Sequence, residues 1–257
     1  MVMAEAGVEF AGVSYALPDG RLLLRGVSLA IEAGTTTALL GRSGSGKTTL
    51  LRMVNALVWP TLGRVLVGGR DVATEDVIAL RRGIGYVIQE TGLFPHMTVE
   101  RNAGMALELA GSHKGNSRSL RDDKQRVDEV LGLVGLDAGE FRERYPWQLS
   151  GGQRQRVGLA RALAADPSVL LMDEPFGALD PMTRAEMQTM LRDLLQRVGK
   201  TVLLVTHDLD EALYLAQRVV FLEAGEVVAD LAASDVLGSQ DPQVRAYIDA
   251  VHRAVKT

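Results

Sequence analysis

The strongest constraint on the fold is a glycine-rich segment, GRSGSGKT from Gly41 to Thr48, which fits the pattern G-x-x-x-x-G-K-[ST]. An apolar, β-branched run from Thr35 to Leu40 precedes it, and a helical pattern from about Lys47 to Leu57 follows. Glycines allow consecutive backbone N–H groups to face one point, and the start of a helix adds the positive end of its dipole. A strand, a flexible loop and a helix in this order predict a phosphate-binding cradle for a nucleoside triphosphate.

Two side chains of this cradle have specific expected roles. Lys47 is expected to neutralise the β- and γ-phosphates, and Thr48 to bind Mg²⁺ through its hydroxyl. The alternative is a glycine-rich turn that contains Lys-Thr by chance, but the flanking strand and helix are the context that a phosphate loop requires. The candidate nucleotide ligands are the residues of the loop and the turn after it: Gly41, Arg42, Ser43, Gly44, Ser45, Gly46, Lys47, Thr48 and Thr49.

Composition limits the class of protein further. The 257 residues are 47% hydrophobic and 23% charged, which suits a globular chain with a large core. The net charge of −4 argues against a general electrostatic grip on nucleic acid, and the absence of cysteine excludes disulfides and thiol chemistry. The apolar runs are too short to span a bilayer, and the first ten residues lack the pattern of a signal peptide. We expect an intracellular protein that reaches a membrane only through a partner.

Periodicity predicts strands that alternate with helices, and therefore an α/β fold with a largely parallel sheet covered on both faces. The expected strands are 8–13, 27–31, 35–40, 64–67, 85–88, 169–172, 201–206 and 218–222. The expected helices are 47–57, 99–134 with a break at 111–117, 153–164, 181–198, 209–216 and 244–255. The break reads as an exposed polar loop in which His113 and Lys114 are solvated. We interpret residues 1–257 as one domain, with a core of about 1–90 and 146–257 and a helical insertion of about 91–145.

The segment from Val169 to Pro175 places two carboxylates directly after a continuous apolar strand. Ligands bind at the carboxyl ends of parallel strands, so Asp173 would reach Mg²⁺ there, through water. Successive strand residues point to opposite sides, which leaves Glu174 available to position and polarise an attacking water. An acidic turn after a core strand is the alternative, and the phosphate loop upstream argues against it.

A second anion site is predicted where Leu149–Gln153, LSGGQ, opens a helix. Ser150 is at or near the N-cap, and Gly151 and Gly152 expose backbone N–H groups at the helix N-terminus, which favours a phosphate. Alone, Ser-Gly-Gly is a common turn. In combination with the two preceding motifs, it indicates an anion site far more specifically.

These three segments together resemble the ATP-binding subunit of ATP-binding cassette (ABC) transporters, and the resemblance extends from about Val8 to Leu222. It implies a P-loop NTPase core with an N-terminal antiparallel β subdomain and an inserted helical subdomain that ends at the 149–153 signature. It also implies roles for four further residues. Tyr15 would stack on adenine, Gln89 would sense Mg²⁺ and the γ-phosphate, Asp180 would cross between subunits, and His207 would hold the γ-phosphate.

The mechanism implied by the resemblance is ATP hydrolysis by phosphoryl transfer to water, with Glu174, His207, Lys47 and Gln89 as the catalytic group and Thr48, Gln89 and Asp173 around Mg²⁺. Residues 150–153 would bind the γ-phosphate held by the phosphate loop of a second copy, which implies a head-to-tail dimer with two ATP molecules between its subunits. Permease subunits and a solute-binding protein would complete the complex. The chain would be a peripheral protein held by the permease at the cytoplasmic face of the cell membrane.

Three stretches resemble importer subunits: Gly85–Val99, Tyr145–Ser150 and Met172–Pro181. The segment Ile88–His96 is most similar to the glycine betaine, choline and osmoprotectant group. Phe94, Pro95 and His96 would shape the groove where the membrane subunit docks. Importers of polar amino acids or polyamines remain alternatives, as do non-transport ABC ATPases. The latter usually insert a coiled coil or carry two cassettes, and neither pattern is present. Some osmoprotectant ATPases carry regulatory modules after the cassette, and we expect none in the residues from Val227 to Thr257.

Overall fold

The structure is a computed structural model that describes residues 7–111, 120–177 and 179–254. Apart from Gly111, the predicted loop at 111–117 with His113 and Lys114 lies outside the described residues, as does Ala178. The chain divides into two compact units. Unit 1 comprises Met1–Leu80 and Lys200–Thr257, and unit 2 comprises Arg81–Gly199.

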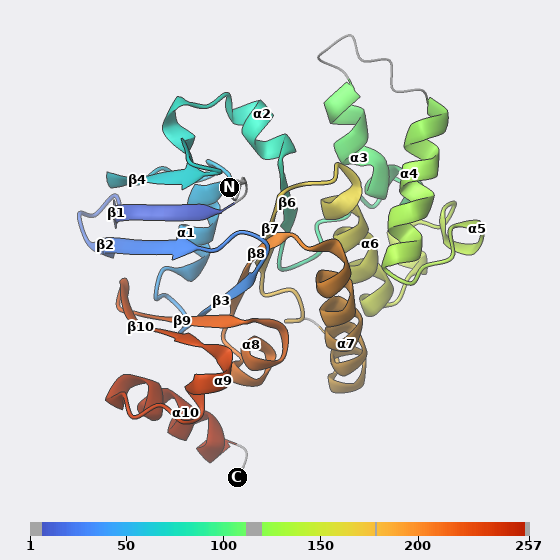
Figure 1. Cartoon of the computed structure of the whole chain (residues 1–257). Helices are drawn as coiled ribbons and strands as arrows, with labels where there is room; N and C mark the ends of the chain where they lie inside the picture. Colours follow the sequence, from blue (N-terminus) through green and yellow to red (C-terminus); the bar gives the residue numbers. More distant parts are fainter. Residues whose placement is uncertain (1–6, 112–119, 178, 255–257) are drawn as a thin grey trace, which may run out of the picture. The chain divides into compact units, whose positions relative to one another are not determined.

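Unit 1 begins with an antiparallel sheet in the order β2-β1-β4-β5 (Figure 1). Its strands are β1 (Val8–Ala16), β2 (Leu22–Ile31), β4 (Leu62–Val67) and β5 (Arg70–Asp71). Alternate residues of β1 and β2 are buried, including Phe10, Val13 and Leu24, so one face of the sheet packs against the interior. The predicted antiparallel β subdomain is confirmed.

The second sheet of unit 1 positions the phosphate loop. Strand β3 (Thr36–Leu40) pairs in parallel with β8 (Thr201–Thr206) on one side and with β9 (Arg218–Glu223) on the other. Strand β10 (Glu226–Ala232) adds an antiparallel edge to β9. Every residue of β3 and β8 is buried, as expected for strands covered on both faces. Leu40 pairs with Thr206, so the residues that follow β3 and β8 emerge at the same edge.

The helix after the phosphate loop is shorter than the sequence predicts. Helix α1 covers Lys47–Val54, whereas the pattern predicted a helix to Leu57. Asn55 is the C-cap, and Ala56 adopts a left-handed φ of 57°, which ends the helix because left-handed residues break its ladder. The N–H groups of Leu57 and Val58 instead donate to the carbonyl of Arg52.

Unit 1 also contains four short elements and one longer terminal helix. The sequence pattern predicts α8 (Leu209–Leu215) and α10 (Pro242–Ala254) with small boundary differences. It did not predict the 3-10 turn at Val72–Thr74, α9 (Ala233–Val236) or α2 (Val77–Arg82), whose last two residues belong to unit 2. These are too short for helical periodicity to show in the sequence.

Unit 2 combines a pair of parallel strands with a group of helices. Strand β6 (Ile84–Val87) pairs with β7 (Val169–Asp173), and Tyr86 lies opposite Leu171. Helices α3 (Val99–Gly111), α4 (Leu120–Leu133) and α6 (Gly151–Ala164) pack against one another (Figure 1). The short α5 (Ala138–Phe141) and a 3-10 turn at Pro146–Gln148 connect α4 to α6.

The long helix α7 (Pro181–Val198) has the bounds that the sequence predicted. Proline opens it at the first helical position, and Gly199 closes it with a left-handed φ of 57°. Its buried residues, including Met187 and Leu191, lie on one stripe at helical spacing. Both termini are therefore determined by local chemistry.

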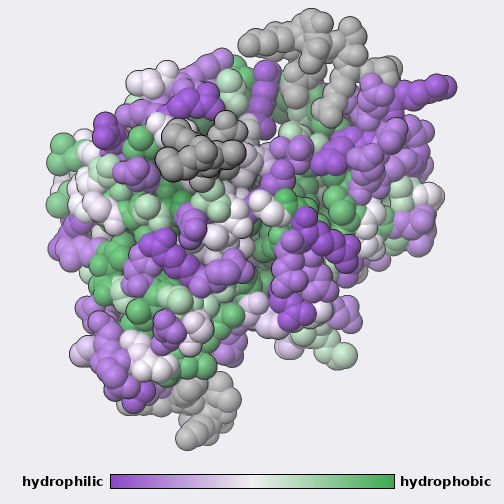
Figure 2. All heavy atoms as spheres, in the orientation of Figure 1, coloured by the Kyte–Doolittle hydropathy of each residue, from purple (hydrophilic) through white to green (hydrophobic). Residues whose placement is uncertain are grey.

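The surface is mixed in character. On the face shown in Figure 2, hydrophobic residues are interspersed among hydrophilic ones. Leu22 and Leu62 are among the exposed apolar residues of the first sheet. Across the described parts of the chain, none of the helices has the length and apolar composition needed to cross a bilayer.

Candidate functional site

The phosphate loop joins the buried strand β3 to helix α1 in unit 1. Its first residue, Gly41, is buried, and a Cβ added there would lie 2.1 Å from the carbonyl oxygen of Leu222 on β9. Only glycine fits this approach of two backbones. Gly46 is the N-cap of α1 with a left-handed φ of 100°, a conformation that side-chain-bearing residues rarely adopt. The loop is therefore shaped by glycine at both ends.

Lys47 is the first residue of α1, and only 6% of it is exposed. Its Nζ donates to the carbonyl oxygens of Gly41 at 2.7 Å and of Arg42 at 3.0 Å. Within the described residues, the buried hydroxyl of Ser45 has no hydrogen-bond partner. An unsatisfied buried hydroxyl beside exposed loop residues is costly unless a polar ligand compensates it.

Two other predicted residues belong to unit 1. His207 follows the last residue of β8 and is exposed, and the β3–β8 register brings its backbone level with Gly41. Tyr15 lies near the end of β1, where it pairs with Leu24 of β2 and is half-buried.

In unit 2, the ends of β6 and β7 bring four polar side chains together. The hydroxyl of Tyr86 donates to Oδ2 of the buried Asp173 at 3.4 Å, and Nε2 of Gln89 donates to Oε2 of Glu174 at 3.3 Å. Parallel pairing of β6 with β7 explains this juxtaposition, because residues after neighbouring parallel strands emerge at one edge. The sequence analysis assigned no role to Tyr86. Its place three residues before Gln89 could have indicated that it lies near the site.

Glu174 has an unusual backbone for a glutamate. Its φ is 45°, in the left-handed region, and Pro175 follows it. Such a conformation costs of the order of 1–3 kcal/mol and tends to persist where the surrounding structure holds a functional group in place. The turn is closed by the N–H of Gly177, which donates to the carbonyl of Glu174 at 3.3 Å.

The 149–153 signature has the local structure that its sequence predicts. Ser150 is the N-cap of α6, and its hydroxyl accepts the N–H of Gln153 at 3.2 Å. The side chain of Gln153 accepts the N–H of Ser150 in return at 2.9 Å, which completes a capping box. Gly152 is buried, and a Cβ there would lie 2.7 Å from the methyl group of Thr183 on α7.

Asp180 has a local structural role in unit 2. It is the N-cap of α7, and its carboxylate accepts the N–H of Thr183 at 3.1 Å. Hydrogen bonds from the side chain and backbone of Thr183 lower the pKa of this fully exposed carboxyl. The group is therefore an anion over the physiological range, at the start of a helix where negative charge is favoured.

Asn102 is a second residue that the sequence analysis missed. It is completely buried on α3, and its Oδ1 accepts the N–H of Phe94 at 2.8 Å. Its Nδ2 donates to the carbonyls of Phe94, Met97 and Thr98 at 3.0–3.1 Å. One amide thus anchors the loop that carries Phe94 and His96, whose rings lie edge to face.

We expect Asn102→Ala to reduce the free energy of unfolding by about 2–4 kcal/mol, because the part-buried backbone groups of Phe94, Met97 and Thr98 lose their hydrogen-bond partner. Urea titration followed by circular dichroism measures the change. Arg101→Ala is the matched control, since Arg101 is exposed on the same helix and should change stability by less than about 0.5 kcal/mol. Equal losses in the two variants would contradict the anchoring role.

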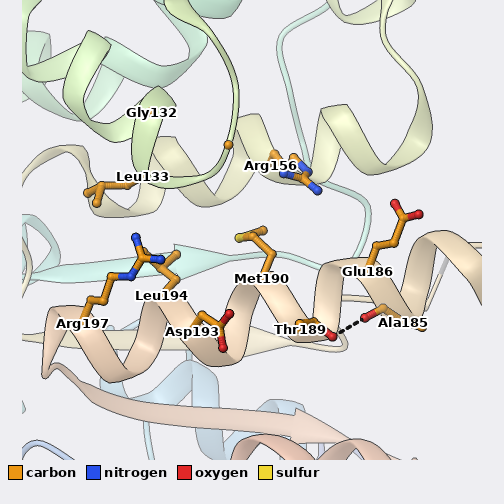
Figure 3. Close-up of a pocket in the computed structure, with 11 residues that line it drawn as sticks. Gly132, Leu133, Arg156, Ala185, Glu186, Thr189, Met190, Asp193, Leu194 and Arg197 are labelled. Carbon is orange, nitrogen blue, oxygen red and sulfur yellow. Dashed lines mark hydrogen bonds between the residues drawn. The ribbon is translucent and has the colours of Figure 1, made fainter.

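Unit 2 also contains a groove of about 780 Å³ between the end of α4 and α7. Figure 3 shows Glu186 and Met190 of α7 on one side and Arg156 of α6 on the other. The groove contains none of the residues assigned to the nucleotide site. Its size therefore does not identify it as the reactive centre.

The sheet, the phosphate loop and the capped signature helix define a P-loop protein of the α/β class. A protein-family model described as "ABC transporter" matches residues 24–177, which is more than half of the chain. The chain belongs to the ABC transporter family, and the fold predicted from the sequence is confirmed.

The curated relatives are named for the import of different solutes. An osmoprotectant import ATP-binding protein, OsmV of Salmonella typhimurium, is 46% identical over 82% of this chain and 54% of its own length. A glycine betaine uptake system ATP-binding protein, YehX of Escherichia coli, is 48% identical over 86% and 69%. A sulfate/thiosulfate import ATP-binding protein, CysA of Mesorhizobium japonicum, is 46% identical over 83% and 60%. The chain spans about half the length of the first of these relatives.

Solved structures share the fold. The post-hydrolysis dimer of the ATP-binding cassette MJ0796, bound to ADP and phosphate, has a TM-score of 0.76 at 33% identity. The match covers 88% of this chain and 98% of that one.

Proposed function

We propose that this chain is the ATP-hydrolysing subunit of an importer and that it energises the uptake of an osmoprotectant such as glycine betaine or choline. The observation that carries the ATPase part is the buried Lys47 at the start of α1, beside the Ser45 hydroxyl. Loop carbonyls hold the ammonium group, and the head of the helix favours an anion. This arrangement suits the phosphates of ATP.

We also assign Mg²⁺ to the site, because it is a hard cation that takes oxygen ligands. Thr48 on the first turn of α1, Gln89 after β6 and Asp173 at the end of β7 are the side chains we assign to it. Bound Mg²⁺ would neutralise negative charge that develops on the phosphate oxygens. The contact from Tyr86 would orient the Asp173 carboxylate.

For the hydrolytic step, we assign Glu174 as the base that takes a proton from the attacking water. Gln89 donates to its carboxylate and so restrains the side chain. His207 and Lys47 would stabilise charge on the γ-phosphate, and Tyr15 would stack on adenine. Positioning and charge stabilisation supply most of the catalysis in reactions of this class.

The partners follow from the second anion site. Residues 150–153 would bind the γ-phosphate held by another copy, with Asp180 crossing between subunits, so two ATP molecules would join a head-to-tail dimer. The dimeric arrangement of the MJ0796 cassette supports this part of the proposal. Permease subunits would hold the dimer at the cytoplasmic face of the cell membrane, and a solute-binding protein would deliver the solute. We propose no nucleic acid partner.

The assignment of 91–145 as a helical insertion is also a proposal.

The solute is the least constrained part. The names of OsmV and YehX favour an osmoprotectant, but CysA, at 46% identity, is named for sulfate and thiosulfate. Importers of other solutes, including polar amino acids and polyamines, therefore remain the second candidate. A non-transport ABC ATPase is the third.

Uptake in the native cell tests the proposal. With Lys47→Ala on the chromosome, uptake of labelled glycine betaine or choline at high osmolarity should fall to the level of a gene deletion. Uptake of sulfate, glutamine and spermidine should not change. Lys124→Ala, at an exposed position on α4, is the control and should retain uptake. Loss of sulfate uptake instead would assign sulfate as the solute in place of an osmoprotectant. Co-purification with ribosomes or DNA in place of a permease would overturn the transport role.

A further inference from the structure

The terminal helix α10 places one aromatic side chain against the strand that leads into the phosphate loop. Tyr247 is half-buried, and its ring lies edge to face on Phe221 of β9, with centroids 5.7 Å apart and planes at 77°. Phe221 pairs with Leu40, the last residue of β3 before the loop. A cavity of about 50 Å³, lined in part by Gly41, Arg42 and Tyr247, lies between the start of the loop and α10.

The hydroxyl of Tyr247 makes a second contact at this edge. It donates to the backbone carbonyl oxygen of His207 at 2.8 Å. The flanking backbone is also held, because Asp208 donates its N–H to the Thr206 hydroxyl at 3.0 Å and its carboxylate caps α8 through the N–H of Glu211 at 3.1 Å. His207 is thus the exposed residue of a short connection whose main chain is fixed on both sides.

The Tyr247 phenol stays protonated and can therefore always donate its hydrogen bond. Burial, together with the nearby Asp208 carboxylate, raises the pKa of the Tyr247 phenol to about 12, and Arg42 opposes this rise. The phenol therefore keeps its proton at physiological pH. The hydrogen bond to His207 and the cavity that Tyr247 shares with Gly41 and Arg42 place the ring beside both the histidine connection and the phosphate loop.

We infer that Tyr247 is a positioning residue for His207: its hydroxyl holds the main chain of His207 so that the imidazole projects toward the γ-phosphate. This inference rests on the proposed function. It assigns α10, beyond the segment that the family model matches, a role in the reaction. Tyr247 itself does not touch the nucleotide in this assignment and acts only through His207.

Tyr247→Phe tests the inference because it removes the hydroxyl and keeps the ring against Phe221. Loss of one hydrogen bond of about 0.5–1.5 kcal/mol predicts a fall in kcat of about two- to thirteenfold. The KM for ATP should change by less than about twofold, because the phosphate loop is untouched. Arg245→Ala, at an exposed site on the same helix, is the matched control and should leave kcat unchanged.

A double-mutant cycle with His207→Ala separates the possible outcomes, with hydrolysis measured at single turnover so that slow variants remain comparable. The inference predicts that Tyr247→Phe has no further effect once His207 is alanine. An unchanged kcat in Tyr247→Phe, or an equal loss in both backgrounds, would overturn the inference and leave the ATPase proposal intact. A wild-type chain without ATPase activity, or normal hydrolysis in His207→Ala, would instead overturn the proposed role of the site.

Discussion

Glu174→Gln is expected to lower the rate of ATP hydrolysis by about 10²–10⁴-fold, the usual contribution of a general base. Glutamine has nearly the same shape, and its side-chain oxygen still offers Gln89 an acceptor, so the local geometry should persist. The uncharged amide, however, no longer takes a proton from water. Phosphate release under saturating ATP and Mg²⁺ measures the effect.

The same variant should also accumulate an ATP-bound dimer, because the two subunits would separate only after hydrolysis. Size-exclusion chromatography with and without ATP detects this species. Glu143→Gln is the matched control, since Glu143 is an exposed glutamate elsewhere in unit 2, and it should behave as the wild type. A near-normal rate of hydrolysis in Glu174→Gln would remove Glu174 from the catalytic group.

Lys47→Ala should weaken ATP binding by about 10- to 100-fold, because charge-assisted hydrogen bonds contribute about 1.5–3 kcal/mol. The lysine is buried at the start of α1, so water replaces its ammonium group poorly. Titration with a fluorescent ATP analogue gives the dissociation constant. Unlike Glu174→Gln, this variant loses binding itself.

The Lys47 variant needs a control for folding, because Nζ also donates to the carbonyls of Gly41 and Arg42. Thermal unfolding followed by circular dichroism establishes whether the variant is folded at the temperature of the titration. Lys124→Ala removes an exposed lysine on α4 and should leave the dissociation constant unchanged. A folded Lys47→Ala protein with wild-type affinity would contradict the assignment.

Elements with strong local signals could be predicted from the sequence. Helix α7 begins at Pro181 and ends before Gly199, and both residues act through their own backbone preferences. Strand β8 is a continuous apolar run with the predicted bounds, Thr201–Thr206. The predicted end of α1 was wrong by about one turn, because Ala56 adopts a left-handed φ. Alanine rarely adopts this conformation, so the sequence does not indicate it.

The motifs of the candidate site were likewise local. The phosphate loop, the carboxylates at the end of β7 and the capping box at Ser150 each depend on residues close together in the chain. The spacing of these residues is therefore enough to predict their chemistry. Periodicity likewise predicts the alternating strands and helices around them.

The sequence by itself determined the fold class, the family resemblance and the candidate residues, because glycine turns, helix caps and apolar periods act over a few residues. Only the tertiary structure decided which residues support them. Tyr86 meets Asp173, Asn102 anchors the loop at Phe94, and Tyr247 reaches the carbonyl of His207 from 40 positions away in the chain. Such contacts follow from strand register and helix packing, which bring distant segments together without leaving a period or spacing in the sequence.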